Sequence, residues 1–386
     1  MRTSLPVAVA LSLLTAAAPA RAEIVVGFIT GLSGPLSSIG IPNSKGVAAG
    51  VAYQDTVGGE KIRLIQLDDA SDPATTTQNV RKLVEREKVD FLIGTSGAPQ
   101  TFAMANAAAE LQTPMVAVSP IAPPPKGEGG PWVVQIPQPQ PLLAKGIVAD
   151  MKKRGLKTIG FIGFSDALGD LMHNSLLANT NGGEVKVVND ERYARTDNSV
   201  IAQVLKTMAL RPDAIMIGGT ATPGALPMLT LAEKGYKGVV YGNNGVMSQD
   251  FLRVAGPAAE GLVAPTGPVI VAEQLPDTNP IKKVALAYRA AYEKANGAQP
   301  TDGFSPYAFD GWVVFLDAAK RALATGARPQ TPEFKQALRK ALFESKEVVG
   351  THAIYNFTPA SSFGVDDRSR VMVRLQKGHW VLVPNE

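Results

Sequence analysis

Residues 23–36 read EIVVGFITGLSGPL, an apolar run that passes into a glycine-rich turn. The part from Ile24 to Ile29 is a short apolar segment bounded by this turn, which is typical of a buried strand. Further along the chain, short β-branched runs keep alternating with amphipathic stretches. This alternation predicts a succession of βα units around a mostly parallel sheet.

The first series of such units extends to residue 118. One of its helices is expected to begin at Asp72 and Pro73, because aspartate suits the capping position and proline the first helical position. Short apolar runs predict the other strands, and periodic apolar residues predict the helices. The strands are expected at 61–67, 90–94 and 115–118, and a further helix near 99–111.

A proline-rich segment separates this series from a second one. Seven of the residues from Ile121 to Pro141 are prolines, a spacing that suits a stiff crossover better than a flexible linker. The second series repeats the plan of the first. Its strands are expected at 157–163, 184–188, 213–217 and 238–241, and its helices near 168–179, 200–208 and 224–234.

The last third of the chain changes character. Residues 261–267 are expected to form a return crossover, three helices follow, and a hairpin around Lys377 and Gly378 ends the chain. A late β element after three helices predicts one more crossing between the lobes. The helices are expected at 280–295, 305–324 and 332–343, and the hairpin strands at 371–375 and 380–383.

These patterns predict an α/β fold of two doubly wound lobes with mostly parallel sheets, joined by three crossovers. Neither lobe is expected to be continuous in sequence. The N-terminal lobe is predicted from residues 23–138 plus 268–348, and the C-terminal lobe from residues 139–267 plus 349–386.

The composition excludes several classes of protein. The 38 basic and 34 acidic residues give a net charge of only +4 over 386 residues, and no dense basic run occurs, so nucleic acid is not an expected partner. The chain has no cysteine, which excludes disulfides, thiol nucleophiles, cysteine zinc sites and iron–sulfur clusters.

The first 22 residues have the features of a signal peptide. Arg2 precedes an apolar stretch, and Ala20-Arg21-Ala22 places small residues where signal peptidase reads them. Cleavage is expected after Ala22, which predicts export to the periplasm. Without Arg2 and Arg21, the mature chain would keep 36 basic residues against 34 acidic ones.

The chemical motifs give little support to catalysis. The two common phosphate-binding motifs are missing, and His173, His352 and His379 have no metal-ligand spacing, so neither a metal nor another cofactor is expected. Ser96 lies in a near match to the G-x-S-x-G motif, with Asp310 and His352 following in order, which leaves a serine hydrolase as an alternative. Backbone amides in the same segment are equally suited to bind an anion without catalysis.

Several local segments together resemble one known family. They are Leu32-Ser33-Gly34-Pro35-Leu36 with Gly40 and Gly46, Asp68 to Pro73, Val118-Ser119-Pro120, and Gly235-Tyr236-Lys237-Gly238. Their order and spacing resemble the type I periplasmic binding proteins, in particular those that bind branched-chain amino acids for ABC importers. The resemblance covers essentially all of residues 23–386.

The resemblance implies a ligand held in the cleft between two lobes that close by hinge bending and then engage a membrane permease. It also implies a monomer without enzymatic activity. The first lobe would hold a carboxylate through backbone amides and hydroxyl groups. Carried over position by position, the ligand contacts would be Ser38, Ile39, Ser96, Gly97, Ala98, Ser119, Ile121 and Ala122 in the first lobe, and Leu168, Thr220 and Asn244 in the second, with Phe304 as an apolar wall.

The departures from the family pattern bear on the ligand. Asn244 lies where the resemblance implies an acidic side chain for the ligand's ammonium group, and Leu168 and Thr220 lie where tyrosines are common. A buried ammonium without a carboxylate partner is unfavourable. The hypothesis is therefore a small carboxylate with an apolar body and no α-amino group, an aromatic acid or an aromatic or branched 2-keto acid. A branched-chain amino acid receptor is the alternative within the family.

Overall fold

The computed structural model describes residues 23–121 and 126–384. The predicted signal peptide, residues 1–22, and the predicted site residue Ala122 lie outside the described residues. Within the described part of the chain, no helix is both long and apolar enough to cross a membrane.

The N-terminal lobe is built on a six-stranded sheet with the strand order β2-β3-β1-β4-β5-β8. All of its pairings are parallel except that of β2 with β3, and β1 lies between β3 and β4 in the middle of the sheet. The strands are β1 (Ile24–Thr30), β2 (Thr56–Val57), β3 (Glu60–Asp68), β4 (Phe91–Gly94), β5 (Met115–Ala117) and β8 (Val133–Gln135).

Helices cover both faces of this sheet. On one face, Phe28 and Phe91 pack with Trp312 and Phe315 in the largest core cluster. On the other face, Leu92 packs with helix residues such as Val80 and Met104. The helices are α1 (Ser37–Tyr53), α2 (Pro73–Arg81) with the π-helical turn η1 (Lys82–Arg86), α3 (Ala98–Glu110), α9 (Pro280–Asn296), α10 (Ser305–Leu323) and α11 (Pro332–Phe343).

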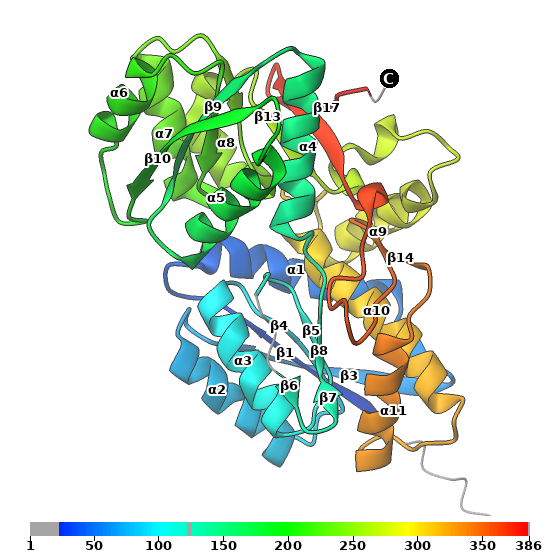
Figure 1. Cartoon of the computed structure of the whole chain (residues 1–386). Helices are drawn as coiled ribbons and strands as arrows, with labels where there is room; N and C mark the ends of the chain where they lie inside the picture. The colour runs from blue at the N-terminus through cyan, green and yellow to red at the C-terminus, as the bar shows by residue number, and fades with distance from the viewer. Residues whose placement is uncertain (1–22, 122–125, 385–386) are drawn as a thin grey trace, which may run out of the picture.

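The C-terminal lobe has a seven-stranded sheet with the order β10-β9-β11-β12-β13-β16-β17. It is parallel up to β13, and the last two strands form the antiparallel hairpin predicted around Lys377 and Gly378. Figure 1 shows this lobe, largely green, above the first one. The strands are β9 (Thr158–Phe164), β10 (Lys186–Tyr193), β11 (Ala214–Gly218), β12 (Val239–Tyr241), β13 (Val263–Thr266), β16 (Val371–Gln376) and β17 (His379–Leu382).

The remaining elements are short or lie on the second lobe and its connections. The helices of this lobe are α4 (Gln140–Lys153), α5 (Ala167–Thr180), α6 (Ile201–Ala209), α7 (Ala221–Glu233) and α8 (Gln249–Ala255). The short elements are β6 (Lys126–Gly127), β7 (Gly130–Pro131), β14 (Val348–Val349), β15 (Ile354–Tyr355), and the 3-10 turns η2 (Asn244–Val246), η3 (Gly256–Ala259), η4 (Pro268–Gln274) and η5 (Asp367–Ser369).

The predicted fold class is confirmed, as two doubly wound lobes with mostly parallel sheets. The predicted start of α2 is also confirmed, because the Asp72 carboxylate accepts a 2.7 Å hydrogen bond from the backbone amide of Thr75 and Pro73 opens the helix. The capping signal at Asp72 and Pro73 therefore predicted the start of this helix correctly.

Two parts of the chain differ from the sequence-based expectation. Residues 263–266 were expected in a crossover, which is wrong: they form β13, because Val263 and Ala264 are fully buried between two other strands. Helix α1 was not predicted, since it contains Pro42 and several glycines. The glycines permit close packing, and a Cβ at Gly46 would lie 1.9 Å from the Ser305 carbonyl oxygen.

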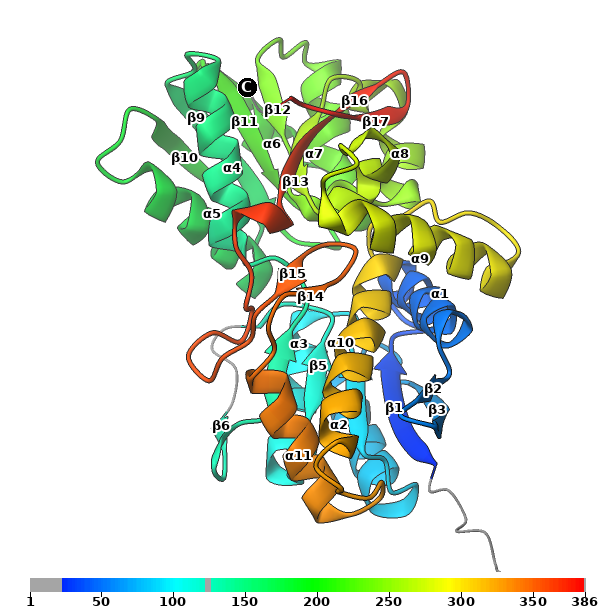
Figure 2. The same ribbon diagram turned by 90° about the vertical axis from the view of Figure 1, so that its right-hand side faces the viewer.

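The third connection between the lobes begins further along the chain than the sequence-based division placed it. Ala353, Tyr355 and Phe357 are buried in the first lobe's core, although the sequence-based division placed 349–386 in the second lobe. The Tyr355 hydroxyl donates a 2.8 Å hydrogen bond to Asp310 on α10, which anchors this segment. Figure 2 shows the β14–β15 hairpin between the two lobes.

Candidate ligand-binding site

The carboxyl ends of the parallel strands of both lobes carry most of the predicted site residues. In doubly wound sheets, ligands bind outside these ends. In the first lobe the loops after β1, β4 and β5 lead to Ser38, Ser96 and Ser119. In the second lobe the loops after β9, β11 and β12 lead to Leu168, Thr220 and Asn244.

Helix α3 begins at this edge without a side-chain cap. Its capping residue is Gly97, which is extended at φ −135° and ψ 154° and has no side chain to accept from the first-turn amides. Pro99, in the first turn, has no amide of its own. An uncapped helix start presents backbone N–H groups and the positive end of the helix dipole, which favours an anion such as a carboxylate.

Ser96 connects the ends of two neighbouring strands through hydrogen bonds. Its side-chain oxygen lies 2.8 Å from the hydroxyl of Thr30 and accepts a 3.0 Å hydrogen bond from the backbone amide of Gly31. The residue is 4% exposed. It therefore fixes the end of β1 against the end of β4, next to the start of α3.

The residues of the serine hydrolase alternative do not form a triad. The hydrogen bonds of Ser96 go to Thr30 and Gly31. Asp310 accepts from the backbone amides of Thr351 and His352, and not from the imidazole. The imidazole Nε2 lies 3.3 Å from the carbonyl oxygen of Gly303. A triad needs the base to bond the nucleophile and the acid to orient the base, and this arrangement does neither.

Helix α5 of the second lobe begins with a charged cap. The Asp166 carboxylate accepts hydrogen bonds from the amides of Leu168 and Gly169, at 3.0 and 3.1 Å. It also forms a 2.6 Å ion pair with Arg195, whose guanidinium stacks over the Phe164 ring at 4.0 Å from the ring centre. This helix start is satisfied by the protein's own side chains.

Thr220 and Asn244 are engaged with neighbouring protein groups. Thr220 caps α7 by position and is buried, and a Cβ at Gly245 would lie 2.3 Å from its methyl group. Asn244 donates a 2.8 Å hydrogen bond from Nδ2 to the hydroxyl oxygen of Tyr307. The two residues are therefore held in place, and their contact with a ligand stays a prediction.

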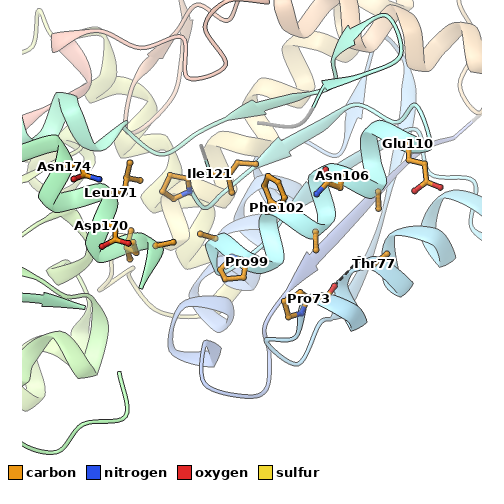
Figure 3. Close-up of a pocket in the computed structure, with 16 residues that line it drawn as sticks. Pro73, Thr77, Pro99, Phe102, Asn106, Glu110, Ile121, Asp170, Leu171 and Asn174 are labelled. Atoms are coloured by element: carbon orange, nitrogen blue, oxygen red, sulfur yellow. Dashed lines mark hydrogen bonds between the residues drawn. The ribbon is translucent and has the colours of Figure 1, made fainter. Parts of the chain in front are cut away.

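A cavity of about 910 Å³ lies between the two lobes, with α3 on one side and α5 on the other (Figure 3). Three predicted site residues line it, namely Ala98, Ile121 and Leu168. The predicted residues that do not line it are Ser38, Ile39, Ser96, Gly97, Ser119, Thr220, Asn244 and Phe304. Of these, Ile39 and Phe304 pack in or against the core of the first lobe.

Two apolar side chains that line this cavity were not predicted from the sequence. Phe102 on α3 and Leu171 on α5 point toward it from opposite lobes (Figure 3). Phe102 is 44% exposed although it is aromatic. It lies one turn after Ala98, and its exposure, which only the structure reveals, distinguishes it from a core residue.

The acidic side chains around this region are paired. Asp68 accepts from the amide of Leu32 at 2.8 Å and from the hydroxyl of Ser33 at 2.6 Å. In the cavity wall, Glu110 pairs with Arg81 and Asp170 with Arg192. Together with Asp166, the acids described at this edge are thus already occupied by protein partners.

Ser71 has a structural role in the first lobe. Its hydroxyl donates to the Ser33 carbonyl at 2.8 Å and accepts from the Leu36 amide at 3.0 Å. The amide group of Gln100 on α3 also donates to the carbonyl of Ser71. These bonds tie the turn after β1 to the first turn of α3.

Comparisons with known proteins agree with this architecture. The family model described as "Periplasmic binding protein" matches residues 23–359. The Leu/Ile/Val-binding protein homolog 2 of Brucella abortus (strain 2308) is 26% identical over 342 residues, covering 84% of this chain and 87% of that protein. The solved structure of an extracellular ligand-binding receptor from Rhodopseudomonas palustris HaA2 is 39% identical, with a TM-score of 0.87, over 94% of this chain and 100% of that one. A leucine binding protein from Thermotoga maritima MSB8, at 20% identity and a TM-score of 0.75 over 94% of this chain and 98% of that chain, shares the fold.

Proposed function

Because the chain belongs to the periplasmic binding protein family, we propose that it is the solute-binding receptor of an ABC importer and that it binds a small carboxylate between its lobes. The signal peptide would be cleaved after Ala22, and the closed, loaded form would engage the membrane permease. The receptor would act as a monomer and carry out no catalysis.

The start of α3 supports the assignment of a carboxylate. The uncapped first turn beside Gly97 offers amides to an anion, and charge-assisted hydrogen bonds to such a group are about twice as strong as neutral ones. Ser96 and Gln100 hold the surrounding backbone in place. The anion would therefore meet a preformed set of donors.

The main observation that disfavours an amino acid ligand is that the acidic side chains near the cavity already have protein partners. Asp166 is used by the α5 amides and Arg195, and the family's acidic position is Asn244, which is bonded to Tyr307. The carboxylates that line the cavity, Glu110 and Asp170, already pair with Arg81 and Arg192. An ammonium group entering this region would therefore have to compete with these arginines for a partner. A ligand without an α-amino group avoids that competition.

The apolar cavity wall supports a bulky, apolar ligand body. Phe102, Ile121, Leu168 and Leu171 line it from both lobes, so closure would remove apolar ligand surface from water on both sides. An aromatic acid, or an aromatic or branched 2-keto acid, combines such a body with one carboxylate.

The names of the curated relatives favour one other candidate. Proteins named for leucine, isoleucine and valine binding are 23–26% identical to this chain, so a branched-chain amino acid is the second candidate ligand. It would require that a group other than the paired acids holds the ammonium.

Titration calorimetry of the ligand-free protein separates the two candidates. The probes are phenylpyruvate, benzoylformate, 4-hydroxybenzoate and leucine. We expect at least one of the acids to bind tightly and leucine to give no heat. Tight leucine binding with no response to the three acids would overturn the ligand assignment and leave the receptor assignment intact.

A further inference from the structure

A largely buried cluster, polar except for one glycine, joins the two lobes to their connections. It has members from both lobes and from all three crossovers, and none of them lines the cavity. We refer to it as the hinge cluster, made of Gln138, Asn244, Gly267, Tyr307, His352 and Ser369.

Tyr307 is the centre of the hinge cluster. It lies in the first turn of α10, is 4% exposed and belongs to the first lobe's core. Its hydroxyl accepts a hydrogen bond from Asn244 of the second lobe and donates one to Oε1 of Gln138 in the first crossover, both at 2.8 Å. One phenol group thus connects the two lobes directly.

The second and third crossovers meet the same group of residues. Gln138 donates from Nε2 to the carbonyl of Ser369, in the third crossover, at 3.0 Å. Gly267, in the second crossover, lies against the imidazole of His352, since a Cβ there would be 1.8 Å from Nδ1. The three connections are therefore tied to one another where the chain passes between the lobes.

The face of the Tyr307 ring also makes a contact, in addition to the hydrogen bonds of its hydroxyl. It stacks on the imidazole of His352 with ring centres 4.0 Å apart and an interplanar angle of 18°. His352 is fully buried, and burial lowers its pKa to about 3. The imidazole is therefore neutral under ordinary conditions, and the stack does not depend on charge.

We propose that Tyr307 is a positioning residue that fixes the angle between the lobes and thereby sets the affinity for the ligand; the affinity part rests on the proposed function. Lobe closure depends on a few residues at the connections. The first connection bonds the phenol through Gln138, and the other two reach it through Gln138 and His352. Removing the Tyr307 hydroxyl would take away the acceptor of the Asn244 Nδ2 group and the donor to Gln138 Oε1, which destabilises this particular arrangement. A receptor whose binding-competent arrangement is less populated binds its ligand more weakly by the same factor.

The absence of cysteine from the chain permits a direct measurement of lobe opening. Gln78→Cys on α2 and Ala178→Cys on α5 place one spin label on an exposed helix position in each lobe. Neighbouring residues on both helices, Thr77 and Asn174, line the cavity, so the distance between the labels follows its opening. This distance can be measured without any ligand.

The test compares three variants in this labelled background. Tyr307→Phe keeps the ring stack and removes the hydroxyl, and Asn244→Ala removes the same bond from the other lobe. Tyr288→Phe is the matched control, because the buried hydroxyl of Tyr288 lies 2.7 Å from that of Ser305 and this bond stays within the first lobe's side of the hinge.

We expect Tyr307→Phe and Asn244→Ala to broaden the label-distance distribution of the ligand-free protein, and their combination to broaden it no further. Tyr288→Phe should keep the parental distribution. For phenylpyruvate, the affinity should fall by about 2- to 10-fold in Tyr307→Phe, the range expected for losing the one hydrogen bond that joins the lobes directly. Unchanged distributions in both hinge variants, or equal broadening in Tyr288→Phe, would overturn the inference. If none of the three acid probes binds, the proposed ligand fails while the distance measurement still decides the role of Tyr307.

Discussion

Helices α3 and α5 face each other across the cavity and begin in opposite ways (Figure 3). The first turn of α3 follows Gly97 and has no side-chain cap. The first turn of α5 follows Asp166, which caps two amides and pairs with Arg195. One helix start is open to an external anion, and the other already holds an internal one. The proposed function would thus use this architectural position for binding in α3, whereas in α5 the position is filled by a capping side chain.

Placing an aspartate cap at the start of α3, as in α5, should cause the largest loss of ligand affinity among the variants considered. In Gly97→Asp, the new carboxylate would accept from the first-turn amides and repel an incoming anion. We expect the affinity for the acid that binds the parent protein to fall by at least about 100-fold, the equivalent of losing one to two charge-assisted hydrogen bonds. Titration calorimetry measures this change.

Gly97→Ala is the control for volume at the same position. A Cβ there would meet side-chain ends, Leu36 Cδ1 at 2.4 Å and Gln100 Oε1 at 2.6 Å, and the aspartate variant has the same contacts plus a charge. The alanine variant should therefore bind more tightly than the aspartate variant by at least about tenfold. Equal affinities of the two variants would show that the amides of α3 do not hold the ligand's charge.

Removing the cap of α5 should affect stability and not binding. Asp166→Ala leaves the amides of Leu168 and Gly169 without their acceptor, and we expect the free energy of unfolding to fall by about 1 kcal/mol. The Arg195 ion pair adds little, because both side chains are more than a third exposed. Urea denaturation gives the stability change, and calorimetry should show an affinity within about threefold of the parent.

The matched variant for this position is Asp166→Asn, which keeps a capping oxygen and removes the charge. It should recover most of the lost stability. A large loss of acid binding in both variants would place a ligand contact on the second lobe and contradict the division of roles between α3 and α5.

The smallest effect that we expect is that of pH on ligand affinity. Binding through backbone amides should be nearly independent of pH above neutrality. Burial raises the pKa of Asp310 to about 6 and lowers that of His352 to about 3. By pH 7, Asp310 is therefore largely ionised and His352 of the hinge cluster is neutral. The affinity for an acid should change by less than about twofold between pH 7 and pH 9. A steady loss of affinity as the pH rises would instead reveal a cationic group that holds the ligand and loses its proton.

Local signals in the sequence were sufficient for most of the fold. The cap at Asp72 with Pro73 acts on its own neighbours and began α2 where the structure has it. The turn at Lys377 and Gly378 likewise predicted the hairpin, with strand ends within one residue of those observed. Helix α1 was missed because Pro42 and its glycines lower helix propensity. Contact with α10 overrides that preference, and no residue near α1 in the sequence indicates it.

The site was less predictable, because its geometry depends on partners that are distant in the sequence. Asn244 was placed against the ligand by position, but its partner Tyr307 follows 63 residues later and belongs to the other lobe. Phe102 and Leu171 were missed since a single apolar residue on an amphipathic helix is common on protein surfaces. Only the facing arrangement of α3 and α5 gives these two side chains a shared cavity.

The central claim is that this receptor holds a carboxylate and has no place for an ammonium group. Phenylpyruvate and phenylalanine differ only in a keto oxygen in place of the amino group, as do 4-methyl-2-oxopentanoate and leucine. Titration calorimetry with each pair measures the effect of that one group on the same binding site. The account predicts that at least one keto acid binds and does so at least about 100-fold more tightly than its amino acid, since a desolvated ammonium without a partner is strongly unfavourable. An amino acid that binds as tightly as its keto acid, or more tightly, would contradict it.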